Sequence, residues 1–197
     1  MERIVLASKN SDKVKEMRLA LQELPVEILS LADFKELPDA VEDGSTFEEN
    51  AIIKAKFFSE QTGLACLADD SGLEVDALNG LPGVYSARFA GWHADDNTNN
   101  QKLLDELKKI NVKESAAAYR CVLAFIDTNG TEILTSGKVE GKIKTVAKGT
   151  GGFGYDPYFY LEENRTMAEI TTAEKNKISH RGAALKEMIL KLKGRFR

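Results

Sequence analysis

The segment from Thr46 to Asp70 constrains the fold of this chain more than any other. Thr46 followed by Glu49 three residues later forms a capping box, and Gly63 is a stop signal, so TFEENAIIKAKFFSEQ predicts a helix. The apolar run LACLA follows and is typical of a buried strand that ends at Asp69–Asp70. A helix that leads directly into a buried strand indicates a mixed α/β fold.

The rest of the chain continues this alternation. Residues 3–7 predict a strand, and Val14, Met17 and Leu21 follow it at helical spacing. Further strands are expected over 117–127 and 132–143, and further helices over 97–110 and 183–196. We therefore predict a single α/β domain over residues 1–197, with a mostly antiparallel or mixed sheet flanked by helices.

Charge and composition exclude several classes of protein. The net charge of -4 argues against a nucleic-acid polymer as partner, although a small polyphosphate needs only a local group of cations. Cys66 and Cys121 lie in apolar runs without CxxC spacing, which indicates small buried side chains. The start MERIVLAS is too short for a signal peptide, and no run reaches membrane-spanning length, so we expect a cytoplasmic protein without a membrane partner.

The turn Ser8–Lys13 is the first candidate site. A strand that runs through a polar loop into a helix places backbone N–H groups and the positive end of the helix dipole together, which suits a phosphate. Ser8 and Asn10 can donate hydrogen bonds, and Lys13 adds a charge. The GxxxxGK[ST] pattern of a P-loop is absent. The alternative is that Ser11 simply caps the helix.

The adjacent carboxylates Asp69 and Asp70 are the second candidate. Carboxylates next to a buried strand are costly unless a cation or N–H donors compensate them. Strand alternation would direct only one of them to a cleft. Glu42 could supply a second ligand, because Mg²⁺ binds through one or two carboxylates, waters and substrate phosphates. An Asx-turn would also explain the pair.

The glycine-rich segment 149–159, GTGGFGYDPYF, is the third candidate. Its glycines permit positive φ or close approach to a ligand. Phe153 and Tyr155 could stack on a base, and Asp156 before Pro157 is held extended. A plain hairpin turn is the alternative.

Basic residues before the last helix form the fourth candidate. Lys175, His180 and Arg181 repel one another and the helix dipole, which favours an anion or a base rich in acceptors among them. His180 could instead be a packing residue. The basic side chains near the C-terminus are typical of a solvated helix face.

Together these segments resemble the inosine and xanthosine triphosphate pyrophosphatases, which remove deaminated purine nucleotides. The matching segments are SKNSDKVKE, TFEENAIIKAK, LADDSGLEVDALNGLPGVYSARFAG, GGFGYDP and SHRGAAL, in the family's order. Ser8–Lys9 replaces a frequent Thr-Gly, and serine keeps the hydroxyl. The resemblance implies an elongated α/β fold with two lobes around a central substrate cleft, a homodimer, and hydrolysis of ITP, dITP and XTP to the monophosphate and pyrophosphate with Mg²⁺.

The resemblance also implies roles for individual residues. Glu42 and Asp70 would hold Mg²⁺, and Asp70 would activate the attacking water. Other residues would bind the phosphates or the nucleoside: Ser8, Lys9, Asn10, Ser11, Asp12, Lys13, Lys54, Ser71, Phe153, Gly154, Tyr155, Asp156, Lys175, His180 and Arg181. Because Arg181 only donates hydrogen bonds, it would accept a 6-keto purine and reject adenine.

Three other functions compete with this one. A pyrophosphatase of pyrimidine or modified nucleotides, as in the Maf proteins of related fold, would use the same chemistry. A non-catalytic nucleotide sensor would keep the phosphate loop and the aromatic pocket without needing Asp70. An α/β scaffold protein would leave the basic residues before the last helix unexplained.

Overall fold

The computed structural model describes residues 2–196. The strands are β1 Arg3–Ala7, β2 Glu27–Ser30, β3 Ala65–Val75, β4 Glu114–Ile126, β5 Glu132–Lys144, β6 Phe159–Glu162 and β7 Arg165–Thr166. The helices are α1 Ser11–Leu21, α2 Phe47–Thr62, α3 Asp96–Lys109, α4 Thr172–Ile178 and α5 His180–Lys193.

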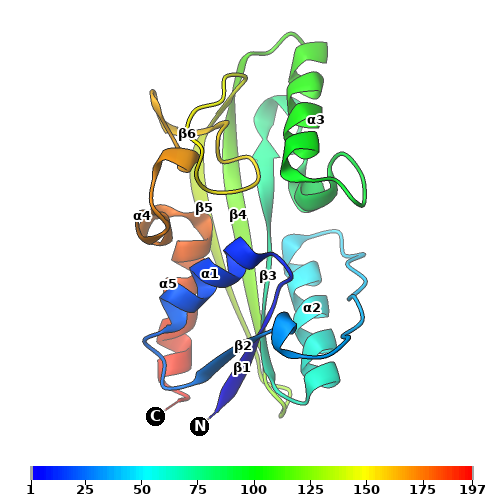
Figure 1. Ribbon diagram of the computed structural model, residues 1–197, viewed down its shortest axis with the longest axis vertical. Coiled ribbons are helices and arrows are strands. Elements are labelled where there is room, and N and C mark those ends of the chain that lie inside the picture. Colours follow the sequence, from blue (N-terminus) through cyan, green and yellow to red (C-terminus); the bar gives the residue numbers. More distant parts are fainter. Residues whose placement is uncertain (1, 197) are drawn as a thin grey trace. The chain divides into compact units, whose positions relative to one another are not determined.

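The seven strands form one mixed sheet in the order β2-β1-β3-β4-β5-β6-β7 (Figure 1). β1 pairs in parallel with β2 and β3, whereas β6 pairs antiparallel with β5 and β7. The predicted α/β class, with a mixed sheet flanked by helices, is confirmed.

The chain divides into two compact units. Unit 1 comprises Met1–Asp70, Cys121–Gly137 and Arg181–Arg197, and unit 2 comprises Ser71–Arg120 and Lys138–His180.

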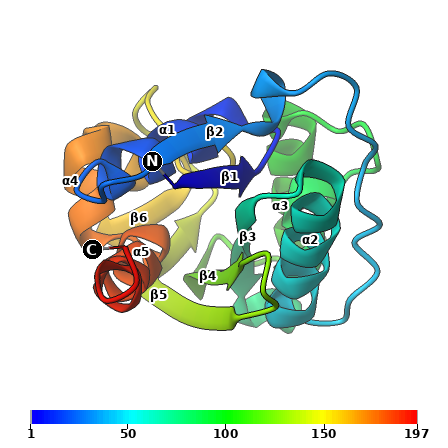
Figure 2. The same cartoon turned by 90° about the horizontal axis from the view of Figure 1, so that it is seen from below.

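Unit 1 has helices on both faces of its strands. Ile4 and Leu6 of β1 pack in one core with side chains of α1 and α5, and the alternate residues Val5 and Ala7 pack in another with α2. This alternation is the two-residue period of a strand buried on both faces. Figure 2 shows α1 and α5 on one side of β3 and β4 and α2 on the other.

Unit 2 is built around the helix α3. Leu103 and Leu107 of α3 are buried in one core with Leu73 and Val75 of β3 and with Phe159 of β6. The four-residue spacing of the two leucines places them on one face of the helix.

The ends of some helices and strands agree with the sequence-based predictions, and others do not. Thr46 caps α2 by accepting from the N–H of Glu49, and Gly63 ends the helix at φ 65°, as predicted. The predicted capping box forms only in part, since the Glu49 carboxylate accepts from the N–H of Ser45 at 2.6 Å. Asn10 and not Ser11 caps α1, because its side chain accepts from the N–H groups of Asp12 and Lys13. The prediction that the strand ends at the aspartates is wrong, since β3 continues to Val75.

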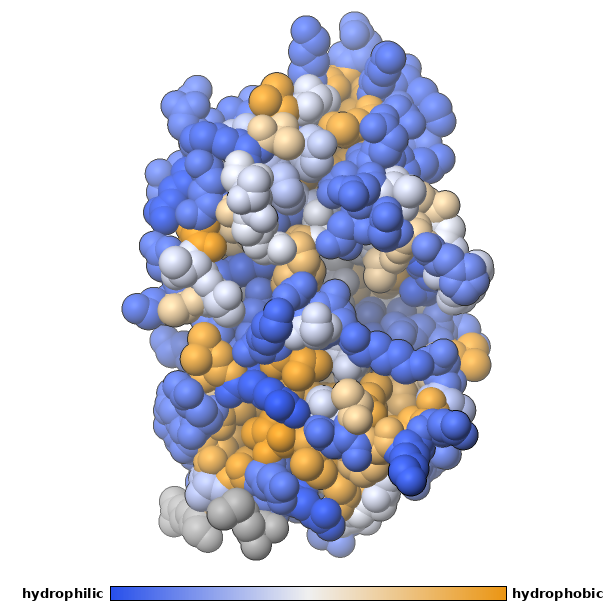
Figure 3. Space-filling view, in the orientation of Figure 1, coloured by the Kyte–Doolittle hydropathy of each residue, from blue (hydrophilic) through white to orange (hydrophobic). Residues whose placement is uncertain are grey.

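One face of the molecule is mainly polar (Figure 3). Hydrophilic side chains cover most of the face in Figure 3, with hydrophobic side chains between them. Within residues 2–196, no helix is both long and apolar enough to cross a bilayer.

Candidate active site

The β1–α1 turn is held together by its own side chains. The Oδ1 atom of Asn10 accepts from the backbone N–H groups of Asp12 at 2.9 Å and Lys13 at 3.0 Å. The N–H of Asn10 itself donates to Oγ of Ser8 at 3.2 Å. The turn therefore has a defined geometry at the N-terminus of α1, where the helix dipole favours an anion.

Asp69 is a buried carboxylate shared by three donors of unit 1. Nζ of Lys13 lies 2.5 Å from Oδ1, and Oδ2 accepts from Nε of Arg181 at 2.9 Å and from Sγ of Cys121 at 3.1 Å. Burial alone would raise the pKa of Asp69, but the charges of Arg181 and Lys13 hold it well below its usual value. Asp69 is thus a fixed negative charge that orients Lys13 at the β1–α1 turn.

Arg181 is buried between two carboxylates. Its side chain is 1% exposed, and Nη1 also donates to Oε2 of Glu16 at 2.5 Å. The sequence predicts repulsion between the positive charges of the basic residues. For Arg181 this charge is compensated by the carboxylates of Asp69 and Glu16. Its role in recognising a 6-keto purine stays a prediction.

Lys54 of α2 connects the two predicted metal ligands. Its Nζ donates to Oε2 of Glu42 at 2.8 Å and to Oδ1 of Asp70 at 2.9 Å. Burial favours the neutral amine, yet Asp70 and Glu42 together raise the pKa of Lys54. Burial also raises the pKa of Asp70, against the opposing charges of Lys54 and Lys13.

The chemistry of this centre fits a hard divalent cation. Oδ2 of Asp70 is buried and has no hydrogen-bond partner within residues 2–196. Two carboxylates from different segments converge on one ammonium group, and these are the oxygen donors that Mg²⁺ prefers. The same described residues hold no cluster of three or more His, Cys, Asp or Glu side chains suited to a metal. A cation here would need water or substrate oxygens as well, which is usual for Mg²⁺.

In unit 2, Asp156 organises the glycine-rich loop. Its carboxylate accepts from Nζ of Lys175 at 2.6 Å, the hydroxyl of Tyr119 at 3.1 Å and the N–H of Phe153 at 3.0 Å. Burial raises the pKa of Asp156 in spite of the lysine. The ammonium of Lys175 also lies 4.2 Å from the centroid of the Phe153 ring, a cation–π contact.

The aromatic side chains of unit 2 differ in exposure. Tyr155 is 4% exposed, and its hydroxyl donates to the carbonyl of Ser86 at 2.8 Å, so Tyr155 is anchored in the core. Phe153 is half-buried. The His180 ring stacks on Tyr119 at 4.8 Å between centroids. Of the two aromatic side chains predicted to stack on a base, Phe153 is the more accessible.

Four further predicted residues have other surroundings. Lys9 pairs with Asp39 in an exposed ion pair, and Asp12 pairs with Lys15. Ser11 is exposed, and Ser71 is half-buried.

Sequence reasoning missed the partners that hold the site residues. The sequence pattern offers Asp69 only as an alternative to Asp70 and assigns no role to Glu16 or Tyr119. Glu16 lies 165 residues from Arg181, and no local pattern signals such a pair. The signal available for Asp69 was its position in a buried strand, where an unpaired carboxylate is costly.

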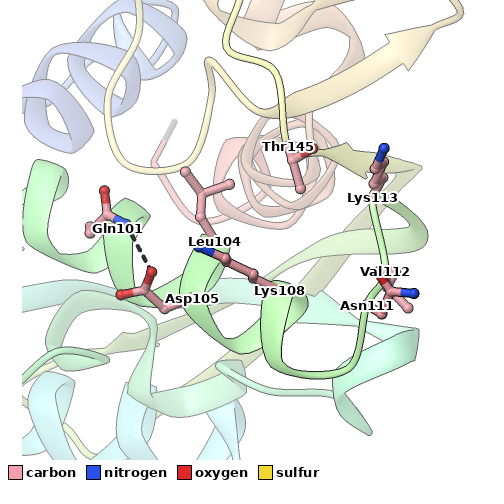
Figure 4. A pocket seen from close by; sticks show the side chains of 8 residues that line it. All are labelled: Gln101, Leu104, Asp105, Lys108, Asn111, Val112, Lys113 and Thr145. Atoms are coloured by element: carbon pink, nitrogen blue, oxygen red, sulfur yellow. Dashed lines mark hydrogen bonds between the residues drawn. The ribbon is translucent and has the colours of Figure 1, made fainter.

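A separate pocket lies at the C-terminal end of α3. It has a volume of about 310 Å³, and Figure 4 shows Gln101 donating to Asp105 beside it. None of the residues that line it is a predicted site residue: Gln101, Leu104, Asp105, Lys108, Asn111, Val112, Lys113 and Thr145.

The fold and site define a mixed α/β protein with a buried carboxylate–lysine centre. The Ham1 family model matches residues 4–191, and the chain belongs to the Ham1 family. The family resemblance carried by the five sequence segments is thereby confirmed.

Relatives and solved structures agree with this assignment. The chain is 50% identical over 186 residues to a dITP/XTP pyrophosphatase of Geobacter sulfurreducens, and the match covers 94% of each chain. It is 45% identical over 201 residues to a dITP/XTP pyrophosphatase of Clostridium perfringens, and that match covers 98% of each chain. A HAM1 protein from Coxiella burnetii has a TM-score of 0.88 at 45% identity, covering 98% of this chain and 100% of that one. The Staphylococcus aureus Ham1 protein has a TM-score of 0.84 at 36% identity, with the same coverage.

Proposed function

We propose that this chain hydrolyses the non-canonical purine nucleoside triphosphates ITP, dITP and XTP to the monophosphate and pyrophosphate. The observation that carries the proposal is the centre of Asp70, Glu42 and Lys54, in a chain whose relatives include dITP/XTP pyrophosphatases. Water adds to the α-phosphorus, the bond to the bridging oxygen breaks, and pyrophosphate leaves.

Glu42 and Asp70 are the proposed holders of Mg²⁺. Oδ2 of Asp70, which has no hydrogen-bond partner among residues 2–196, and the convergence of both carboxylates on Lys54 support this assignment. When bound, Mg²⁺ supplies positive charge that offsets the charge developing on phosphate oxygens.

Asp70 is the proposed general base. A carboxylate within hydrogen-bond reach of water can orient it and accept its proton, and a pKa raised by burial makes Asp70 a better proton acceptor. Asp69 is poorly suited to this role because two cations hold its pKa well below normal.

The substrate contacts follow the family resemblance. We assign the phosphates to the turn Ser8–Lys13 with Lys54 and Ser71, and the nucleoside to Phe153–Asp156 with Lys175, His180 and Arg181. The dipole of α1 and the charge of Lys13 support the first assignment. The Phe153 ring, which is less buried than that of Tyr155, supports the second. We also propose a cytoplasmic homodimer, which the same resemblance implies, and light scattering on the purified protein tests the dimer.

A substrate panel tests the proposed function. The purified chain is incubated with Mg²⁺ and each of ITP, dITP, XTP, GTP, ATP and the pyrimidine triphosphates, and pyrophosphate and orthophosphate are measured separately. We expect pyrophosphate from the first three substrates and loss of turnover with a chelator, restored by added Mg²⁺. Orthophosphate as the product, or a preference for pyrimidines, would overturn the proposal.

A further inference from the structure

The two backbone polar groups of Gly154 are both held by side chains of α3. The N–H of Gly154 donates to Oδ2 of Asp96 at 2.6 Å, and its carbonyl accepts from Nδ2 of Asn100 at 2.9 Å. Asp96 and Asn100 are four residues apart and therefore share one face of the helix. We call this pair the Gly154 clamp.

The clamp acts on a residue of the glycine-rich segment 149–159 whose backbone is left-handed. Gly154 has φ +62°, in the left-handed region, and lies between Phe153 and Tyr155. Within the loop, Asp156 already binds the N–H of Phe153. The clamp fixes the loop from outside, and the bond to Asp96 is strengthened because its acceptor is charged.

Packing alone does not explain the clamp. Asn100 is 7% exposed, and its Oδ1 is buried with no hydrogen-bond partner in the part of the chain described. A buried acceptor of this kind is costly, and an apolar side chain of similar size would avoid the cost. Asp96 is exposed, so it contributes no core packing.

We propose that Asp96 and Asn100 are positioning residues for nucleoside binding: by fixing Gly154 they hold the Phe153 ring where a purine base stacks. This inference rests on the proposed function of the loop. It predicts that the clamp governs substrate affinity and base selectivity while the chemical step is unaffected, because the clamp binds the backbone of Gly154 and not the proposed base Asp70.

The test compares Asp96→Ala, Asn100→Leu and the conservative Asp96→Asn in the full chain. We expect KM for dITP to rise about tenfold in the first two variants, roughly the loss of one hydrogen bond, with kcat changed less than about twofold. Asp96→Asn keeps a neutral acceptor and should recover part of the loss. The ratio of kcat/KM for dITP over dATP should fall in parallel.

Asp95→Asn is the matched control. Asp95 caps α3 by accepting from the N–H of Thr98 at 2.7 Å, and its side chain therefore serves the start of the helix and not the loop. This variant should lower Tm while KM remains that of the parent protein. Amide exchange of Gly154, followed by NMR without ligand, should accelerate in Asp96→Ala and not in Asp95→Asn.

Unchanged KM in both clamp variants, or a fall in kcat at constant KM, would overturn the inference. Unchanged Gly154 exchange in Asp96→Ala would also overturn it. Failure of the parent protein to hydrolyse dITP would instead reject the proposed function, and the exchange measurement would still decide whether the clamp orders the loop.

Discussion

Asp69 and Asp70 are neighbours in β3, but their carboxylates bind different cations. Asp69 accepts from Lys13 and Arg181, whereas Asp70 accepts from Lys54. Strand alternation separates the two side chains onto opposite faces. The shifts in pKa also have opposite signs, lowered for Asp69 and raised for Asp70. One aspartate is therefore suited to fixing charges, and the other to exchanging a proton.

Replacing Asp70 by asparagine should remove activity and preserve the fold. The variant keeps the shape of the side chain but cannot accept a proton, so we expect kcat for dITP to fall by about 10²–10⁴-fold. Pyrophosphate release measures the loss, and circular dichroism verifies the fold. Activity equal to that of the parent protein would assign the base elsewhere.

Replacing Asp69 by asparagine should act mainly on stability. Without the Asp69 carboxylate, the buried positive charge of Arg181 loses one of its negatively charged partners. We therefore expect the free energy of unfolding at pH 7 to fall by about 3–5 kcal/mol. Urea unfolding measures this change. The exposed substitution Asp105→Asn is the control, with an expected change below about 0.5 kcal/mol.

The same variant should change the dependence of stability on pH. The pKa of Asp69 is lower in the folded than in the unfolded protein, so its contribution is present above the unfolded value of about 3.9 and is lost as the pH falls through the folded value. The parent protein should lose this contribution below about pH 4. The free energy of unfolding of Asp69→Asn should therefore fall less steeply below about pH 4 than that of the parent protein. An identical pH dependence of the two unfolding free energies would contradict the lowered pKa of Asp69.

Gly152 should tolerate a methyl group poorly. Gly152 has φ +70°, and an added Cβ would collide with Oδ2 of Asp156, which is already bonded to Lys175 and to the N–H of Phe153. Gly130 also has positive φ, at +81°, with open space around its Cβ position. We expect Gly130→Ala to lower the free energy of unfolding by about 1–2 kcal/mol through backbone strain alone. Gly152→Ala should lower it further, because the steric collision adds to the strain.

KM separates the two glycine variants further. Displacement of Asp156 should raise KM for dITP in Gly152→Ala, while Gly130→Ala should retain the parent value. Equal stability losses with equal KM values would show that Asp156 adapts to the methyl group without disturbing the loop.

The parts of the structure set by local chemistry were predictable, and those set by long-range pairing were not. The limits of α2 follow from Thr46 and Gly63, which act within one turn of the helix. The continuation of β3 past Asp70 was missed because DDSG is typical of a turn. Asp69 is stabilised inside a strand by partners such as Lys13 and Arg181, which lie 56 and 112 residues away in the sequence.

Arg181 provides a test of base recognition. A guanidinium carries five N–H donors, and in this chain Nε and Nη1 contact Asp69 and Glu16. Lysine keeps the charge but cannot reproduce this forked geometry. We expect Arg181→Lys to lower Tm and to narrow the ratio of kcat/KM for dITP over dATP, because a misplaced donor discriminates less between a 6-keto and a 6-amino group. Glu16→Gln, which removes one charge partner and keeps Arg181, should lower Tm with a smaller effect on the ratio. A ratio unchanged in Arg181→Lys would assign base recognition to other residues and leave Arg181 as a structural link between Glu16 and Asp69.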